Sequence, residues 1–255
     1  MTALHVDRYG EGPRVLLVHG SFVHPADPWE RQLPLADEFM LGLVARRGYG
    51  RSPDVERVDF ERDGADLAEL LDEPAHLVGH SYGGIGALYA AARRADAVRS
   101  LTVIEPPALA LAGNDRAAVE LQRRLATVFE AGGEPRRLYA RFMEAWGYEP
   151  PDEGALAELD ERALASSATE RPPWEADPPL DVLRRAPFPK LVVSGDWANA
   201  PPAARGLAGR AYAAVCTTLT RELGAERLVV ADYSHRPQLA GPAFNGPLRE
   251  LLRRG

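Results

Sequence analysis

Cysteine, lysine and long apolar runs are scarce in this 255-residue chain, which contains one cysteine, Cys216, and one lysine, Lys190. A single thiol excludes an internal disulfide, and its apolar neighbours favour a small buried side chain. No stretch approaches the roughly 20 apolar residues of a membrane-spanning helix, and residues 1–8 lack the basic and apolar regions of a signal peptide. We therefore expect a cytoplasmic protein.

Acidic residues outnumber basic ones, which gives a net charge of −7 and a pI near 5.5. Nucleic acids and anionic membranes bind basic surfaces, so we expect neither as a partner. The sequence has no metal-ligand spacing, no phosphate loop and no dinucleotide fingerprint, so we expect no metal and no cofactor. Arginine, alanine, proline and glycine are abundant, a bias typical of a GC-rich bacterial genome.

One serine motif stands out. Ser81 lies in Gly79-His80-Ser81-Tyr82-Gly83, between the apolar run 75–78 and the small-residue stretch 84–92. This order predicts a strand, a sharp turn and a helix, in which small neighbours allow the strained backbone that exposes the serine hydroxyl as a nucleophile. The string G-x-S-x-G also arises by chance in ordinary loops, but its flanking segments favour a catalytic serine.

A serine hydroxyl needs a nearby base, usually histidine, to attack at neutral pH. In enzymes with a strand-turn-helix serine, the base follows the nucleophile and the acid in chain order. Of the six histidines only His235 does so, in a loop after the apolar segment 228–231. A lone loop histidine is more often simply solvated, yet as the sole candidate His235 is our predicted base.

Two backbone N–H groups must then stabilise the oxyanion of a tetrahedral intermediate. Tyr82 should supply one, because the first N–H groups of a helix are unpaired and the helix dipole favours negative charge there. The loop after the apolar strand 15–19 should supply the other. We assign this second donor to Ser21, with Phe22 as a near alternative.

From about Arg14 to the C-terminus, these ordered motifs resemble the α/β-hydrolase fold superfamily. His19-Gly20 is similar to its oxyanion loop, residues 46–52 to the loop after its next strand, residues 79–83 to its nucleophile elbow and His235 to its base. The resemblance implies a cofactor-free serine hydrolase with a Ser-His-acid triad and a helical lid over the site.

The acid of the triad departs from the family pattern. The family usually places it a few residues past the glycine that ends the penultimate strand, whereas Asp196 follows that glycine directly. Glu105 ends the strand after the nucleophile helix, where some members carry the acid. We favour Glu105 and keep Asp196 as the alternative; otherwise Asp196 caps a turn and Glu105 pairs with an arginine.

Alternating strand and helix patterns predict a mostly parallel, doubly wound sheet of the α/β class. Its core should comprise residues 1–105 and 188–255, while residues 106–187 break the alternation and should fold over Ser81 as a small helical lid. Strands are expected at 4–8, 15–19, 40–45, 76–78, 101–104, 191–194 and 228–231. Helices are expected at 28–35, 60–71, 83–94, 203–223 and 244–253, and in the lid at 116–131, 135–146 and 152–167.

The lid is rich in aromatic residues that either line an apolar acyl pocket or only fix the lid to the core. As substrate contacts we predict Trp146 and Trp174 from the lid, with Phe22 and His24 from the oxyanion loop. The lid arginines are expected to form a solvated face rather than a carboxylate clamp. No apolar stripe suited to a subunit interface can be distinguished from the lid helices, so the sequence leaves the oligomeric state open.

Three functions are compatible with these residues. The first is hydrolysis of an ester, thioester or related small acyl substrate by Ser81, His235 and an acid. The second is a biosynthetic acyltransferase, cyclase or lyase at the same site, which would add no net water. The third is a non-catalytic protein of this fold that binds a small molecule, in which Ser81 would not react with a fluorophosphonate.

Overall fold

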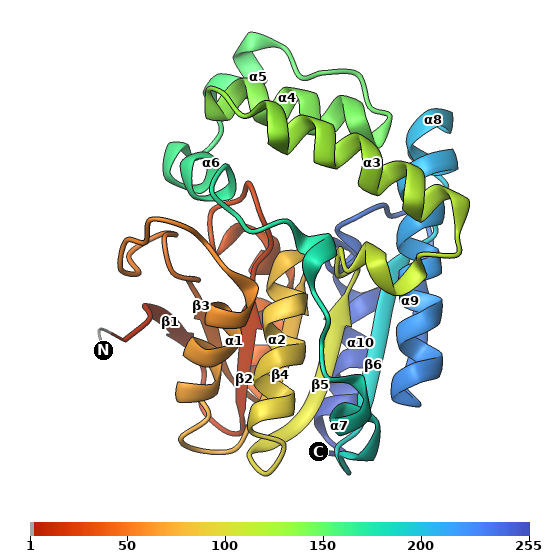
Figure 1. The fold of residues 1–255 in the computed structure, drawn as a ribbon. Helices are drawn as coiled ribbons and strands as arrows, with labels where there is room; N and C mark the ends of the chain where they lie inside the picture. Colours follow the sequence, from red (N-terminus) through yellow and green to blue (C-terminus); the bar gives the residue numbers. More distant parts are fainter. Residues whose placement is uncertain (1–2) are drawn as a thin grey trace.

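Seven strands form one sheet in the order β1-β3-β2-β4-β5-β6-β7 (Figure 1) in the computed structural model, which describes residues 3–255. β1 runs antiparallel to β3, and every other neighbouring pair in this sheet is parallel. The predicted class, a mostly parallel α/β sheet, is therefore confirmed. The strands are β1 Val6–Tyr9, β2 Arg14–Val18, β3 Met40–Val44, β4 Ala75–His80, β5 Val98–Ile104, β6 Lys190–Gly195 and β7 Glu226–Val230.

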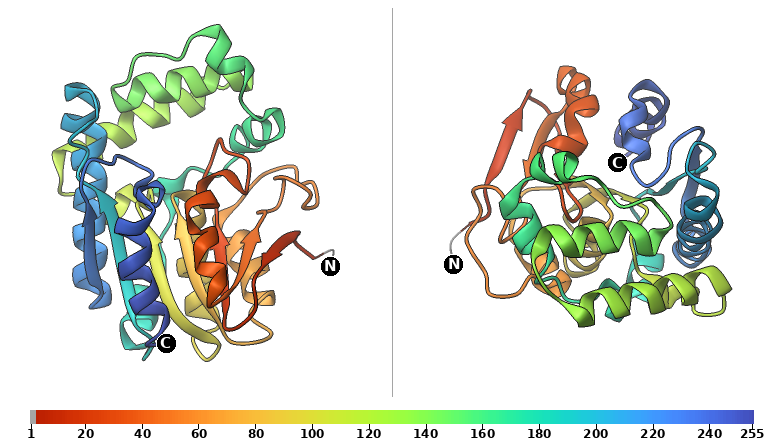
Figure 2. Two further views of the ribbon diagram at one scale, coloured as in Figure 1. Left: turned by 180° about the vertical axis from the view of Figure 1, so that it is seen from behind. Right: turned by 90° about the horizontal axis from the view of Figure 1, so that it is seen from above.

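Helices cover both faces of the sheet, and Figure 2 shows the second face from behind. On one face α1 (Phe60–Glu69), α2 (Tyr82–Arg93) and α9 (Arg210–Leu223) bury their apolar sides in one continuous core. On the other, the 3-10 helix η1 (Asp27–Asp37) and α10 (Pro242–Leu252) pack around a second core. β4, between them, is buried along its whole length, as expected for a strand in the centre of a doubly wound sheet.

Further helices lie over the carboxyl ends of the strands (Figure 1), where they cross the sheet when it is seen from above (Figure 2). We call α3 (Arg116–Ala131), α4 (Pro135–Trp146), α5 (Glu153–Ala157) and α6 (Glu161–Ser167) the cap. The short helices η2 (Leu109–Ala112) and η3 (Pro173–Glu175) flank the cap in the chain. α7 (Leu180–Arg185) instead packs against α2 and α9. The division into a core and a lid of residues 106–187 stays a prediction.

Several expected elements differ in detail. The single helix expected at 152–167 is wrong, because the chain breaks after α5 and the Asp160 side chain caps a new helix by accepting from the N–H of Ala163. Residues 27–37 form a 3-10 helix with prolines near its start and inside it. α9 is preceded by the turn α8 (Pro202–Ala204) and a π-helical segment at Arg205–Gly209.

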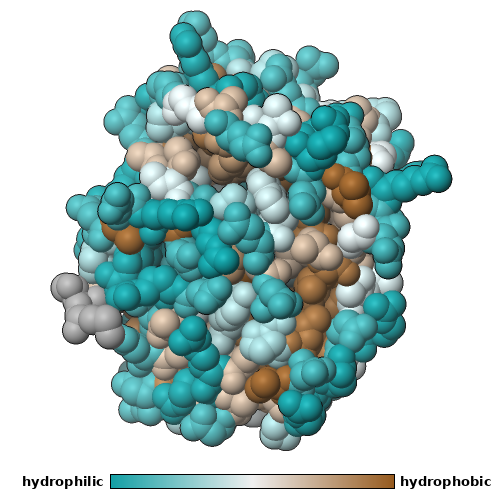
Figure 3. Space-filling view, viewed as in Figure 1, coloured by the Kyte–Doolittle hydropathy of each residue, from teal (hydrophilic) through white to brown (hydrophobic). Residues whose placement is uncertain are grey.

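The face of the molecule drawn in Figure 3 is mostly hydrophilic, with apolar side chains exposed mainly in a strip on its right-hand side. Within residues 3–255, no helix has the length and apolar character needed to cross a membrane.

The turn from β4 to α2 leaves no room for side chains at its two glycines. A Cβ atom at Gly79 would lie 2.6 Å from the carbonyl oxygen of Gly83, and one at Gly83 would lie 2.3 Å from the carbonyl oxygen of His19. Both neighbours are backbone atoms and cannot rotate away. Ser81, at the apex, has a φ of 53°, a strained value for a residue with a side chain.

We expect Gly83→Ala to lower the free energy of unfolding by about 1–3 kcal/mol or more, because the added methyl group overpacks a backbone contact. Gly206→Ala is the matched control, since nothing lies within 4 Å of a Cβ atom there and alanine is the better helix former. Urea denaturation of both variants checks this, and equal stability of Gly83→Ala and wild type would contradict it.

Candidate active site

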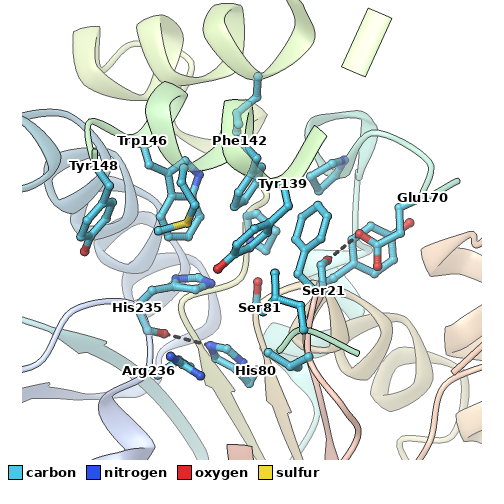
Figure 4. Close-up of a pocket in the computed structure, with 18 of the residues that line it drawn as sticks. Ser21, His80, Ser81, Tyr139, Phe142, Trp146, Tyr148, Glu170, His235 and Arg236 are labelled. Carbon is cyan, nitrogen blue, oxygen red and sulfur yellow. Dashed lines mark hydrogen bonds between the residues drawn. The ribbon is translucent and has the colours of Figure 1, made fainter. Parts of the chain in front are cut away.

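Ser81 is fixed at the carboxyl end of β4 by its backbone. Its N–H donates to the carbonyl oxygen of Ile104, on β5, at 2.8 Å, and its own carbonyl oxygen accepts from the N–H of Gly84 at 2.8 Å. The side chain has its hydroxyl directed into the cavity beneath the cap (Figure 4). The serine motif therefore places a hydroxyl where a substrate can reach it.

His235 lies beside Ser81 in the lining of the same cavity (Figure 4). Its Nδ1 is 2.9 Å from Oε2 of Glu105, and in the neutral imidazole Nδ1–H donates to this carboxylate. With Nδ1 protonated, Nε2 carries the free lone pair that can accept a proton. Aromatic rings surround the imidazole, with the Tyr212 centroid at 4.6 Å and the Trp146 centroid at 4.7 Å.

The carboxylate hydrogen-bonded to His235 belongs to Glu105, which is fully buried at the end of β5 with a φ of 42°. Its other oxygen, Oε1, accepts from the N–H of Gly195 at 3.0 Å and from Nε1–H of Trp197 at 2.9 Å. Burial raises the pKa of Glu105 to about 8, against the lowering effect of the Trp197 and Gly195 hydrogen bonds. The N–H of His235 is a third donor that favours the ionised form.

Asp196 occupies a different environment, exposed at the surface. Its Oδ1 accepts from the N–H of Ala198 at 3.0 Å and from the N–H of Asp232 at 2.9 Å. These bonds cap a turn and connect it to the loop that carries His235, which agrees with the interpretation of Asp196 as a turn-capping residue. The roles of the two acids in a triad stay predictions.

Burial lowers the pKa of His235 to about 3, and the nearby Arg236 guanidinium contributes in the same direction. Burial therefore favours the neutral imidazole, which is the protonation state of a general base.

His80 holds the backbone of the His235 loop, a role that the sequence did not reveal. Its Nε2 lies 2.8 Å from the carbonyl oxygen of His235, to which it donates in the Nε2–H tautomer (Figure 4). Its Nδ1 is buried without a hydrogen-bond partner. Burial lowers the pKa of His80 well below the usual value for histidine. The only signal available in the sequence was its position next to Ser81.

The two predicted oxyanion donors border the cavity close to Ser81. Tyr82 is the first residue of α2, so its N–H has no acceptor within the helix. Ser21 lies in the loop after β2 and also lines the cavity. The N–H of Phe22, our alternative donor, already donates to Oγ of Ser167 at 2.7 Å. This bond favours Ser21 over Phe22 as the second donor.

The cavity has a volume of about 420 Å³, and its lining combines nine Phe, Tyr and Trp side chains with polar and charged ones such as Asp27, Asp160 and Arg236. The four predicted substrate contacts, Phe22, His24, Trp146 and Trp174, all belong to it. Within the lining, Phe142 packs between Phe22 and Trp146, with both centroid distances at 4.9 Å. All the site residues predicted from the sequence line this cavity except Asp196 and Glu105. Glu105 lies behind the lining, where it is hydrogen-bonded to His235.

No three His, Cys, Asp or Glu side chains among residues 3–255 are arranged to hold a metal ion.

The chain belongs to the alpha/beta hydrolase family, whose model matches residues 15–245, and it is a hydrolase. It is 33% identical over 191 residues to the pimeloyl-[acyl-carrier protein] methyl ester esterase of Methylococcus capsulatus, with 72% of each chain covered. It is 39% identical over 117 residues to lipase LipV of Mycobacterium tuberculosis, with 44% of each chain covered. The solved structure of an alpha/beta hydrolase from Sphaerobacter thermophilus has a TM-score of 0.69 at 24% identity, covering 97% of this chain and 95% of that one, and shares the fold.

We expect Glu105→Gln to lower kcat by on the order of 10³- to 10⁴-fold, because the amide can no longer hold and stabilise the imidazolium of His235. Asp196→Asn keeps the Oδ1 acceptor that caps the turn and should leave kcat close to that of wild type. Steady-state kinetics of both variants on one ester substrate check this. A larger loss in Asp196→Asn would reverse the assignment of the acid.

We also expect kcat/KM to rise with pH to a plateau, with a midpoint no higher than about pH 8. The competent form has an ionised Glu105 and a neutral His235, so a proton added to either group removes the base. Activity is therefore lost as the pH falls. A pH profile of kcat/KM measures this, and an increase on acidification would contradict the base role of His235.

Proposed function

We propose that the protein is a serine esterase that cleaves a carboxylic ester, thioester or related acyl compound without a cofactor. The observation that carries this proposal is the hydrogen bond from His235 to the buried Glu105, beside a strained serine in the same cavity. A neutral, oriented imidazole next to a hydroxyl that faces a cavity is the arrangement of nucleophilic acyl transfer.

In the acylation step, Oγ of Ser81 attacks the substrate carbonyl carbon while its proton passes to Nε2 of His235. The carbonyl oxygen becomes an oxyanion, which the N–H groups of Ser21 and Tyr82 stabilise. Glu105 stabilises the imidazolium. When the tetrahedral intermediate collapses, the bond to the leaving group breaks, His235 returns the proton to the departing oxygen or sulfur, and Ser81 remains acylated.

Deacylation repeats these steps with water. His235 takes a proton from water as the hydroxide oxygen attacks the acyl carbon, and the same two N–H groups stabilise the second oxyanion. The bond between the acyl carbon and Oγ then breaks, and His235 returns the proton to Ser81. The net reaction consumes one water and yields an acid and an alcohol or thiol.

The aromatic lining supports a small-molecule substrate with an apolar acyl chain or ring. The names of the relatives, a methyl ester esterase and a lipase, support ester bonds as the bond class. Neither name fixes the acyl group that this cavity accepts.

The test combines covalent labelling with isotope tracing. We expect one fluorophosphonate adduct on the purified protein, absent from Ser81→Ala, and a loss of several orders of magnitude in kcat in that variant. Intact mass spectrometry counts the adducts, and a Ser81→Ala enzyme with wild-type rates would refute the proposal.

For a substrate that is turned over, one oxygen-18 atom from labelled water should enter the acid product. Turnover without label would identify a transferase, cyclase or lyase instead. Absence of an adduct together with tight binding of a small molecule would indicate a binding protein.

A further inference from the structure

Glu170, in the segment that follows the cap, is bonded to the oxyanion loop, which comprises residues 19–24. Its Oε2 accepts a hydrogen bond from the hydroxyl of Ser21, shown as a dashed line in Figure 4. Its Oε1 accepts from the hydroxyl of Tyr49 at 2.7 Å and from Nη2 of Arg46 at 2.7 Å. The Glu170 side chain is only 3% exposed, so protein groups rather than water satisfy this carboxylate.

Arg46 donates hydrogen bonds to backbone carbonyl oxygens of the same loop. Its Nε donates to the carbonyl oxygen of His19 at 3.1 Å, and its Nη2 donates to that of Gly20 at 3.1 Å. Asp63 accepts from its Nη1 at 2.9 Å. Because Arg46 is fully buried, it cannot replace these acceptors with water without leaving its site.

Farther along the loop, Phe22 is bonded to the end of α6. The N–H of Phe22 donates to Oγ of Ser167, which itself donates to the carbonyl oxygen of Ala163. Phe22 has a φ of 60°, so this loop is held in a conformation that a free chain rarely adopts. The N–H of Ser21 therefore lies between the two anchored residues Gly20 and Phe22, and its own side chain is anchored by Glu170.

We propose that Glu170 is a positioning residue for the oxyanion hole and that it acts through the hydroxyl of Ser21. The inference rests on the proposed function, because it requires the Ser21 N–H to bind the developing oxyanion. Positioning matters because the donor must lie about 2.7–3.1 Å from the oxyanion, and losing one donor costs about 10²- to 10³-fold in kcat. The segment after the cap is then part of the catalytic machinery as well as a cover for the cavity.

The alternative is that Glu170 only neutralises Arg46 and so stabilises the protein. The two roles predict different kinetics. Loss of stability lowers the fraction of active molecules, whereas a displaced oxyanion donor lowers kcat per active molecule and leaves ground-state binding nearly intact.

The experiment compares Glu170→Gln, Ser21→Ala and the double variant, with kcat expressed per Ser81 labelled by a fluorophosphonate. Glu170→Gln removes the charge at nearly constant shape, and Ser21→Ala removes the hydroxyl but keeps the N–H. We expect kcat to fall about tenfold to a hundredfold in Glu170→Gln and about tenfold in Ser21→Ala, with KM nearly unchanged. Because Ser21→Ala removes this bond and Glu170→Gln removes its charge, both act on the same interaction, and the double variant should fall no further than Glu170→Gln alone.

Glu161→Gln is the matched control, because it makes the same change in the cap where Glu161 pairs with Arg136 in solvent. It should keep wild-type kinetics. Wild-type kcat per labelled site in Glu170→Gln, or additive losses in the double variant, would overturn the inference. If Glu170→Gln does not fold, a folded Ser21→Ala with wild-type kcat overturns it equally. Failure of wild-type Ser81 to label would overturn the proposed function instead.

Discussion

The buried carboxylate of Glu105 connects the carboxyl ends of three adjacent strands. It extends from β5 and accepts from Gly195 at the end of β6, from Trp197 just beyond it, and from His235 in the loop after β7. A carboxylate without water must find its donors within the protein, so the two segments that supply them, the end of β6 and the loop after β7, are held at fixed separations from the end of β5. The orientation of the imidazole thus follows from the same bonds that join the sheet to its loops. Trp197 also stacks on Tyr212, whose ring in turn contacts the imidazole of His235.

The parts of the site that could be predicted from the sequence are those with local signals. Gly79 and Gly83 flank Ser81 because the turn excludes side chains, and such a constraint is visible in five residues. Chain order alone selected His235. The choice between Glu105 and Asp196 was harder, because both stand at strand ends. The structure separates them by burial, since Glu105 is buried against the imidazole of His235 whereas Asp196 is exposed. The break before α6 could have been found, since Asp160 precedes a helical pattern in the position of a capping residue.

Contacts across long stretches of chain were not predictable. Ser21 and Glu170 are 149 residues apart, and nothing in either neighbourhood indicates the other. His80 is similar, because its bond to the backbone of His235 depends on where the β7 loop crosses β4. These contacts depend on how the segment after the cap and the loop after β7 pack against the ends of the strands. A sequence pattern describes one segment at a time and contains no information about this packing.

Contacts around the candidate site therefore join the cap and the segment after it to the loops at the carboxyl ends of the strands. Trp146 contacts His235 from above, while Ser167 and Glu170 bond the loop beneath. The indole rings have a further consequence. Of the four tryptophans, Trp29 is buried on the far face, while Trp146 and Trp174 line the cavity and Trp197 bonds Glu105. Three of the four indoles thus lie at the cavity or at the buried acid beside it, so a change in the cavity should alter the intrinsic fluorescence of the protein.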